Sequence, residues 1–542
     1  MSTVGKLVVC ALAYLLYLLV KYPNRAIGTR KRKSPTTIDL PGWPLIGHLP
    51  WIIINRGHNL EDGTVAGLKF GPGFSFTLPG IRIIDISKSE WIEYVQKTNF
   101  NNFVKAPLRQ PIMRDVLGSG IFVMDGAIWK RVRHATSSIF TPNTFKNVIV
   151  PSTNQSMMGL AKLLTSAAEE KCAIDMCDLF LRFTLDAFLR MTFGRDLDIF
   201  NAGYGDQSNA SCPPELFKNS AAGFAKAFDI AQDQMDFRLA IVMGWELMEK
   251  LNIRSMGQRM KDSCRVLDDF VYSLVDERLE NAYDSSPSDL LSLFITARDN
   301  CDGGLGRTEL RDTAINLIIA GRDTTAQAIS WAFFHLLMKK DLVSKIREQT
   351  TAVLGADRVN QQQVTYDNYK RFVWARAVLL EALRLHPSVP KNGLIALADD
   401  QIPGGPFIEA GSMVRWSDWQ MGRDPSIWGT DCAEFKAERW IDEAGSIKQL
   451  GQFKFHSFNG GPRICLGMNL AIFEGVKVIV EVLRDFELEF AEGWLKNVPK
   501  SQPIDGQTSE YETPMYKNSI TLPMATPMML SVKLRPHCES ED

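Results

Sequence analysis

The 542-residue sequence predicts a mainly α-helical protein with a minor β region. Apolar residues recur with the helical period over much of residues 85–390, and the longest such run covers residues 308–338. Short apolar runs bounded by Gly or Pro have the length and residue types of strands. No internal repeat of roughly 20–50 residues indicates a solenoid or a propeller.

The individual elements follow from these patterns in chain order. Strands are expected at residues 74–78, 81–86 and 413–416. Helices are expected at residues 129–140, 308–338, 341–353, 372–385 and about 466–484. The tail is expected to form a late hairpin between residues 519–522 and 529–534.

Composition and charge narrow the class of protein. Hydrophobic residues make up 45% and charged residues 23%, which is typical of a globular chain and not of a disordered one. The formal net charge of -1 gives no bulk electrostatic reason to expect nucleic acid. Because the nine cysteines contain no Cys-x-x-Cys pair, they favour a reducing compartment over structural zinc or a disulfide framework.

The N-terminal segment predicts a membrane anchor. Residues 1–33 contain no acidic residue, and residues 7–20 form an apolar run preceded only by Lys6. Basic residues follow the run, which favours keeping that side in the cytosol. A cleaved signal peptide would instead place its positive residues before the run. We expect an anchor at residues 1–22 and a basic, Pro-rich hinge at 23–50.

The most informative segment is Phe458-Asn459-Gly460-Gly461-Pro462-Arg463-Ile464-Cys465-Leu466-Gly467. A cysteine thiolate bound to haem iron favours O–O cleavage, and a position just before a helix favours the anionic sulfur. Gly461 and Gly467 allow tight turns near a flat porphyrin. Arg463 is placed to pair with a haem propionate. The pattern predicts Cys465 as the iron ligand, with Phe458 also contacting the cofactor.

This segment resembles the cysteine loop of the cytochrome P-450 family. Glu381-Ala382-Leu383-Arg384 resembles the family's Glu-x-x-Arg helix, and the segment around Arg439 resembles the one that completes a buried Glu-Arg-Arg network. The resemblance covers about residues 41–534 and implies the P-450 fold, a triangular helical domain with haem between the long central helix and the Cys-loop helix. It implies a catalytic domain at residues 51–542 and haem b, non-covalent apart from the bond between Cys465 and iron.

Two further segments match the family around the haem. Ala320-Gly321-Arg322-Asp323-Thr324-Thr325 resembles its oxygen-binding groove, and Gly with hydroxyl side chains favours a local opening of the helix. Asp323 and Thr324 are the predicted catalytic residues, because an acid beside an alcohol can organise the water that supplies protons. Trp129 and Arg133, one helical turn apart, resemble the family's propionate-binding pair.

The resemblance also narrows the substrate. The segments at residues 383–390, 421–423, 427–429 and 452–455 resemble the fungal and plant branches that hydroxylate fatty acids or alkanes at the terminal carbon. His386 replaces the Tyr usual in those branches, and Ala320 replaces the Glu through which some members attach haem covalently. Substrate contacts are expected from residues 101–125, 319–324, 389–392 and 521–524, whose apolar content suits a lipophilic molecule.

The source of electrons is expected to be a separate protein. The chain has no Gly-x-Gly-x-x-Gly fingerprint for a flavin or dinucleotide domain. The resemblance implies electrons from NADPH through NADPH–cytochrome P-450 reductase, with cytochrome b5 as a second candidate partner. Lys130, Arg131 and Lys454 are candidate docking residues, although solvated surface charges explain them equally well. The implied location is the endoplasmic reticulum membrane, single-pass, with the catalytic domain facing the cytosol.

Three alternatives stay open from the sequence. The substrate of a hydroxylase could be a terpenoid, a sterol or a polyketide, because apolar segments suit these as well. A family member that rearranges hydroperoxides is disfavoured by the intact Asp323-Thr324 pair. A non-catalytic haem-binding or gas-sensing protein belongs to a different class. Four histidines, at positions 134, 335, 386 and 456, lack metal-ligand spacing, so structural roles are expected for them.

Overall fold

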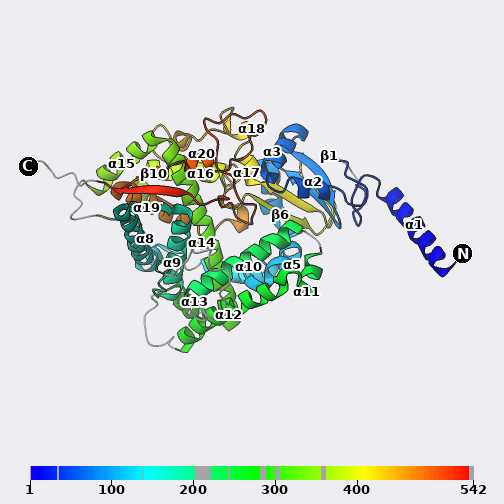
Figure 1. Cartoon of the computed structure of the whole chain (residues 1–542), viewed down its shortest axis with the longest axis horizontal. Helices are drawn as coiled ribbons and strands as arrows, with labels where there is room; N and C mark the ends of the chain where they lie inside the picture. Colours follow the sequence, from blue (N-terminus) through cyan, green and yellow to red (C-terminus); the bar gives the residue numbers. More distant parts are fainter. Residues whose placement is uncertain are drawn as a thin grey trace, which may run out of the picture.

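The computed structural model describes residues 2–32, 36–137, 140–201, 221–241, 244–280, 289–299, 305–355 and 362–535 (Figure 1). Helices dominate these ranges and small sheets lie among them, which confirms the predicted class, mainly α with a minor β region. Lys33, the last residue of the basic block after the apolar run, lies outside the described residues.

The helices and strands of the described residues have the following bounds. The helices are α1 (Thr3–Lys21), α2 (Leu49–Ile54), α3 (Asn59–Phe70), α4 (Ser89–Glu93), α5 (Ala106–Leu117), α6 (Gly126–Ser137), α7 (Pro142–Thr144), α8 (Val150–Glu170), α9 (Met176–Phe193), α10 (Ala221–Ile241), α11 (Trp245–Lys250), α12 (Met256–Glu280), α13 (Leu290–Asp299), α14 (Arg307–Met338), α15 (Lys340–Leu354), α16 (Val373–Leu385), α17 (Asp418–Met421), α18 (Pro425–Trp428), α19 (Met468–Asp485) and α20 (Trp494–Asn497). The strands are β1 (Ile38–Asp39), β2 (Gly73–Leu78), β3 (Ile81–Ile86), β4 (Phe103–Val104), β5 (Ala173–Asp175), β6 (Lys391–Ala396), β7 (Asp400–Gln401), β8 (Phe407–Ile408), β9 (Met413–Ser417), β10 (Phe486–Phe490) and β11 (Met529–Leu534).

The main sheet has the order β1-β2-β3-β9-β6-β4. β2 and β3 form an antiparallel hairpin in which Leu78 pairs with Ile81, and the turn uses Gly80 at a φ of 80°. β9 runs parallel to β3 and antiparallel to β6. In Figure 1 this sheet lies near α2 and α3, on the side of the molecule from which α1 projects.

The long helix α14 is the axis of the helical part. Most of its residues are buried, and it packs against α9, α16, α12 and α19. A helix that is apolar on most of its surface is stable only inside a protein. The expected helix at residues 308–338 is therefore confirmed. In Figure 1, α8, α9, α15 and α19 lie on one side of α14, and the main sheet lies on the other.

The predicted tail hairpin is wrong in its first strand. β11 pairs antiparallel with β10 and with β5, whereas residues 519–522 are not a strand. The backbone of this segment bonds side chains of α14 instead: Leu522 N–H donates to Gln327 Oε1 at 2.9 Å, and Leu522 O accepts from Trp331 Nε1 at 2.9 Å. Contacts with a helix that is remote in sequence override the local strand pattern.

The N-terminal segment is separate from the packed part. α1 has no buried residue and is long and apolar enough to cross a membrane. In Figure 1 it projects away from the rest of the molecule. Residues 23–50, the predicted hinge, contain β1, in which Ile38 pairs with Phe74, and Ala26 is fully buried.

Candidate active site

A cavity of about 320 Å³ lies between α14 and the segment of residues 458–467, which we call the Cys loop. Asp323 and Thr324 line one side, and Cys465 and Gly467 line the other. The cavity brings together eight of the nine predicted site residues: Cys465, Arg463, Phe458, Gly467, Trp129, Arg133, Asp323 and Thr324. The ninth, Gly461, does not line the cavity.

The Cys loop holds the thiol of Cys465 open to the cavity. Cys465 N–H donates to Phe458 O at 2.8 Å, and η9, a 3₁₀ turn at Gly461–Arg463, precedes the thiol. Gly461 has a φ of 60°, and a Cβ there would lie 2.9 Å from Gln96 O. Gly467 is not in the left-handed region and serves instead as the N-cap of α19. The Cys465 side chain is exposed, and that exposed surface belongs to the cavity wall.

Two opposing effects act on the Cys465 thiol. The surface of the thiol opens into a cavity inside the protein, and this enclosure by protein raises its pKa, while a hydrogen bond from Gly467 N–H and the positive charge of Arg133 lower it. Of these three influences, burial has the largest effect on the pKa of the thiol. The expected helix begins at Met468, so Cys465 lies three residues before it, where the N–H of Gly467 can reach the sulfur.

Arg463 has unused hydrogen-bond donors beside the cavity. Its Nη2 pairs with Asp125, and its guanidinium lies 4.3 Å from the ring centroid of Trp129. Its Nε and Nη1 are buried and have no hydrogen-bond partner among the described residues. Burial lowers the pKa of Arg463, whereas Asp125 raises it. Because buried polar groups are normally paired, these donors indicate that an acceptor outside the chain belongs here.

Two further basic residues that the sequence did not single out join this cluster. Lys105 is buried and lines the cavity with Arg109. Burial followed by the charge of Arg463 lowers the pKa of Lys105 well below its usual range and that of Arg109 to about 10. Asp125 Oδ2 accepts from Lys105 N–H at 2.9 Å. We call Lys105, Arg109, Arg133 and Arg463 the cationic cluster.

On the α14 side of the cavity, two hydroxyl groups donate to backbone carbonyls of the helix. Thr324 Oγ1 donates to Ala320 O at 2.5 Å, and Thr324 O accepts from Ser388 Oγ at 2.7 Å. Gly321 is required because a Cβ there would lie 1.8 Å from the ring of Phe188. Burial raises the pKa of Asp323, whose Oδ1 has no hydrogen-bond partner among the described residues. An acid and an alcohol therefore adjoin the same cavity.

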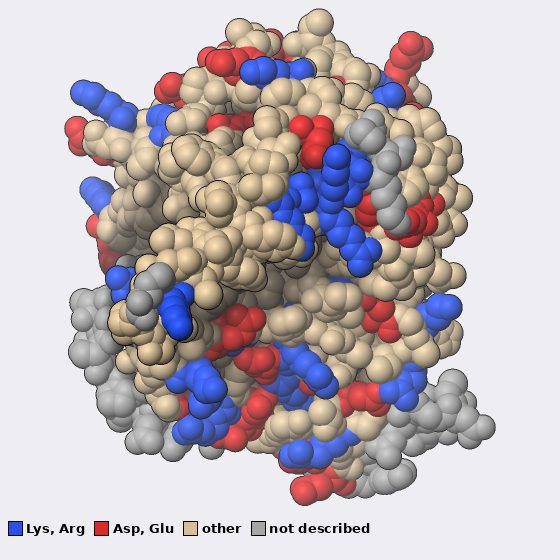
Figure 2. All heavy atoms as spheres, turned by 90° about the vertical axis from the view of Figure 1, so that its right-hand side faces the viewer, with Lys and Arg blue, Asp and Glu red and all other residues tan. Residues whose placement is uncertain are grey.

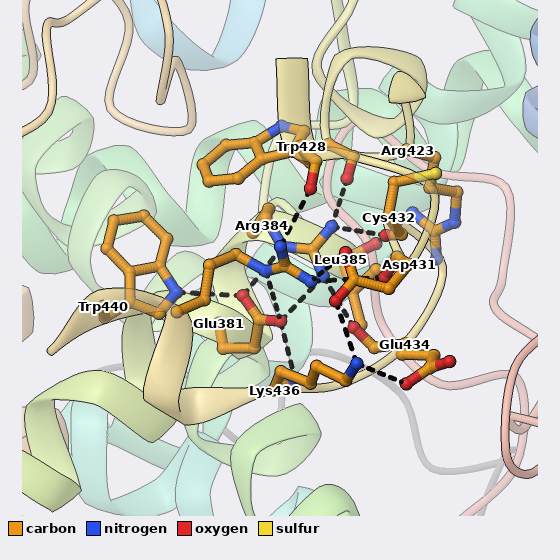
Figure 3. Close-up of polar contacts among 12 residues, drawn as sticks. Glu381, Arg384, Leu385, Arg423, Trp428, Asp431, Cys432, Glu434, Lys436 and Trp440 are labelled. Atoms are coloured by element: carbon orange, nitrogen blue, oxygen red, sulfur yellow. Dashed lines mark hydrogen bonds and ion pairs between the residues drawn. The ribbon is translucent and has the colours of Figure 1, made fainter. Parts of the chain in front are cut away.

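The Glu-Arg-Arg residues form a closed network (Figure 3), and Glu381, Arg384 and Arg439 do not line the cavity. Arg384 makes two bonds of 2.7 Å to the carboxylate of Glu381, and both side chains are fully buried. Glu381 also accepts from Trp440 Nε1 at 2.9 Å and lies 3.5 Å from Arg439 Nε. The remaining guanidinium N–H groups of Arg384 donate to backbone carbonyls, namely those of Gly422, Cys432 and Glu434.

The segments expected to contact substrate all reach the cavity. Lining residues come from residues 101–125, 319–324, 389–392 and 521–524. The first of these contains the helix α5 instead of being wholly a loop. Phe188 of α9 and Met235 of α10 complete the apolar wall, and no local sequence pattern had identified them. The wall thus suits an apolar substrate.

The candidate docking residues differ in their surroundings. Lys130 and Lys454 are exposed, whereas Arg131 pairs with Glu309 of α14. Figure 2 shows the molecular face that carries the N-terminal segment, and Lys and Arg side chains are interspersed there with Asp and Glu side chains. Arg131 therefore has a structural partner, and Lys130 and Lys454 are the more accessible candidates.

The residues present fit a haem with one protein ligand to its iron. Within the described ranges, no group of three or more His, Cys, Asp and Glu side chains is placed to hold a metal ion. A haem supplies its own nitrogen ligands and needs a single axial residue, which the Cys465 thiol can provide. The unpaired donors of Arg463 match the carboxylates at the edge of that cofactor.

Comparisons with known proteins agree with this geometry. The family model described as Cytochrome P-450 matches residues 39–508. The chain is 37% identical over 536 residues to cytochrome P-450 monooxygenase cyp1 of Mycosarcoma maydis, covering 96% of this chain and 78% of that one. It is 30% identical over 496 residues to cytochrome P-450 704B1 of Arabidopsis thaliana, covering 85% and 90%. It is 27% identical over 541 residues to cytochrome P-450 94B1 of the same plant, covering 96% of both. With its fold, its Cys loop and most of its length matched, the chain belongs to the cytochrome P-450 family of haem-thiolate, oxygen-incorporating oxidoreductases.

Proposed function

We propose that the protein hydroxylates the terminal carbon of a long-chain fatty acid or alkane. The observation that carries the proposal is a single cavity with a cysteine thiol on one wall, an acid–alcohol pair on the other and apolar residues between them. When bound, haem supplies the reductive activation of O₂ and the insertion of one oxygen atom into a C–H bond.

The chain's own residues have three tasks in this proposal. Cys465 would hold the haem iron through its thiolate and supply electron density to it, and Arg463, Trp129 and Arg133 would orient the cofactor through its propionates. Burial raises the pKa of Asp323, which favours a carboxyl that can take up and pass on a proton, and Thr324 would orient the water that carries this proton to oxygen. The apolar wall excludes other water and positions the alkyl chain.

The apolar wall and the motif resemblance to terminal hydroxylases support this substrate class. A rigid terpenoid, sterol or polyketide is the second candidate, because the same wall accepts it. Electrons are proposed to come from NADPH through a reductase that docks near Lys130 and Lys454, with cytochrome b5 as an additional donor. α1 is proposed to anchor the protein in the endoplasmic reticulum membrane with the catalytic domain in the cytosol.

Substrate binding tests the proposal directly. Holoprotein is titrated with fatty acids and alkanes of increasing chain length while the haem spin state is followed by absorption. We expect a low-spin to high-spin shift whose midpoint depends on chain length. Products formed with reductase and NADPH are then identified, and a terminal alcohol is the expected result. A shift with a polycyclic lipid only would overturn the proposed substrate, and NADPH consumption without a product would support a non-catalytic haem protein.

Thr324→Ala tests the proton route. The variant should bind haem and substrate normally but release peroxide in place of hydroxylated product, because the ordered water is lost. Ser330→Ala is a matched control, since Ser330 Oγ makes the same kind of bond, to Ala326 O at 2.8 Å, on the same helix. Tightly coupled turnover in Thr324→Ala would contradict the assigned role.

Cys465→Ala tests the iron ligand. The variant should lose the red-shifted Soret band of the reduced carbonyl complex that marks thiolate ligation. Cys264→Ala is the control, because burial raises the pKa of that thiol to about 12 and it does not line the cavity. Retention of the red-shifted band in Cys465→Ala would refute ligation by this residue.

A further inference from the structure

A chain of four buried or half-buried polar side chains connects the main sheet to the Cys loop. Asp418 begins α17, directly after β9, and its Oδ1 lies 2.5 Å from His456 Nδ1. His456 Nε2 lies 2.8 Å from Gln96 Oε1. Gln96 Nε2 lies 2.5 Å from Asn459 Oδ1. Asn459 is the second residue of the Cys loop, so the chain ends in the segment that carries Cys465.

The hydrogen-bond directions in this chain follow from one backbone group. Gly460 N–H points at Asn459 Oδ1 at 3.1 Å, and a backbone N–H can only donate. The Asn459 atom is therefore the oxygen, and the Gln96 atom that faces it must be the NH₂ nitrogen. The other amide atom of Gln96 is then an acceptor, so His456 Nε2 must carry a proton.

This assignment fixes the proton count of the buried pair. With a proton on Nε2, a second proton must lie between His456 Nδ1 and Asp418 Oδ1, because two acceptors would repel each other at 2.5 Å. The pair is therefore either imidazolium with carboxylate or imidazole with carboxylic acid, and it is neutral overall in both forms. Burial raises the pKa of Asp418 and His456 lowers it, which agrees with a proton held by the pair.

The last residue of this hydrogen-bonded series, Asn459, has a backbone conformation that needs support. Asn459 is in the left-handed region with a φ of 63°, which is unfavourable for a residue with a Cβ. Its N–H donates to His456 O at 2.7 Å, and Phe458 O beside it accepts from Cys465 N–H at 2.8 Å. Gln96 belongs to the π-helix η1 (Tyr94–Thr98), whose backbone is in contact with Gly461. The hydrogen bond from Gln96 to Asn459 and the backbone contact with Gly461 therefore act on the same turn of the Cys loop.

We propose that Asp418, His456 and Gln96 are positioning residues that set the Cys loop, through Asn459, for ligation of iron by Cys465. We assign none of the three a direct part in the chemical step, although Gln96 and Asp418 also border the cavity. They act on iron ligation through the side-chain amide of Asn459, which lies in the backbone turn that precedes Cys465. The inference rests on the proposed ligation of iron by Cys465.

A double-mutant cycle between Gln96 and Asn459 tests whether Gln96 influences the haem site through its hydrogen bond to the Asn459 side chain. Gln96→Leu removes both bonds, and Asn459→Gly keeps the left-handed turn but removes the side chain. Each holoprotein should shift the reduction potential of the haem and lose haem roughly fivefold to tenfold faster, which is the size of one lost hydrogen bond. The double variant should differ little from the worse single variant. Additive effects on the potential would overturn the proposal.

Two controls separate positioning from general loss of structure. Tyr94→Phe lies in the same π-helix and removes a bond to Asp400 at 3.1 Å that does not lead to the Cys loop, so its potential should equal that of the wild type. If Gln96→Leu does not yield holoprotein, Gln96→Glu replaces it in the cycle, because a carboxylate accepts from His456 but has no N–H for Asn459.

Asp418 provides a rescue test. Asp418→Asn can donate its amide N–H to a neutral His456 that keeps its Nε2 proton, so the potential and haem retention should stay near those of the wild type. Asp418→Leu should behave like Gln96→Leu. Equal behaviour of the two Asp418 variants would overturn the proposal. A wild-type protein without the red-shifted carbonyl band would instead refute the ligation by Cys465 itself.

Discussion

Two buried arginine sites differ in how their donors are used. Arg384 is fully buried, and its guanidinium pairs with Glu381 and with backbone carbonyls, so the network is closed within the protein. Arg463 pairs through one nitrogen with Asp125, while its Nε and Nη1 have no hydrogen-bond partner among the described residues. Arg109 and Arg133 add further positive charge around it.

The difference separates a structural charge from a ligand-binding one. A buried charge is tolerated when its hydrogen bonds are satisfied, and it is costly when they are not. Arg384 meets this condition without a ligand. Arg463 would meet it when a carboxylate of a bound molecule accepts from its unpaired donors, which is the reason for the proposal that it binds a haem propionate. Substitutions at the two arginines and at a third buried charged group test whether the two kinds of site differ in this way.

The largest effect is expected for Arg384→Leu. The substitution leaves the carboxylate of Glu381 buried with weaker partners, so the free energy of unfolding should fall by about 3–5 kcal/mol. Chemical denaturation of the haem-free and haem-bound forms measures it, and both forms should be destabilised. Arg265→Leu is the control, because that arginine is 58% exposed and its ion pair with Asp262 is worth about 0–1 kcal/mol. Equal losses in the free energy of unfolding for the two substitutions would contradict a closed network that stabilises the fold.

Glu474→Gln sharpens the comparison with a buried acid that has no partner. Both carboxyl oxygens of Glu474 on α19 are unpaired among the described residues, and burial raises its pKa from 4.5 to about 8. The unfolded chain loses this proton first, so wild-type stability should fall as pH rises from about 4.5 to 8. The substitution removes this slope and should stabilise the protein by about 3 kcal/mol at pH 7, with no gain near pH 4.5. Parallel pH profiles of the two proteins, measured by denaturation, would show that Glu474 is paired.

Arg463→Leu should give the smallest change in the fold and a selective change in cofactor binding. The free energy of unfolding of the haem-free protein should stay level or rise, because an incompletely paired buried charge is removed. Haem loss should become roughly ten to a hundred times faster, as expected for a lost charge-assisted bond of about 1.5–3 kcal/mol. Transfer of haem to an acceptor protein measures the rate. A haem-free form as unstable as Arg384→Leu would remove the distinction between the two sites.

The fold class and the centre of the site were predictable for a physical reason. Apolar residues occur on all sides of the helix at residues 308–338, so the sequence alone places this helix inside the protein, and α14 confirms this placement. The Cys loop is a contiguous motif, and the structure places Cys465, Arg463 and Phe458 in the lining of the cavity. Local patterns of this kind depend on neighbours in the chain, which a sequence displays.

The remaining parts depend on contacts between distant segments. Lys105 and Arg109 lie in a segment that was expected to contact substrate, but the sequence does not indicate that both are buried near the charge of Arg463. The expected strand at residues 519–522 is lost to bonds with Gln327 and Trp331, about 190 residues away in the chain. His456 was expected to have a structural role, but the sequence could not name its partners, Asp418 and Gln96.

The exposure of α1 has a consequence for attaching the catalytic part of the protein to a different membrane. Because none of its residues is buried, its contacts contribute little to the stability of the rest of the chain. An apolar helix held in a bilayer by its own lipid contacts would confine the cavity to a thin layer next to the membrane, where lipophilic molecules are concentrated. A cavity of modest affinity could then be filled, and exchanging α1 for another membrane-targeting helix would redirect the same chemistry without refolding the domain.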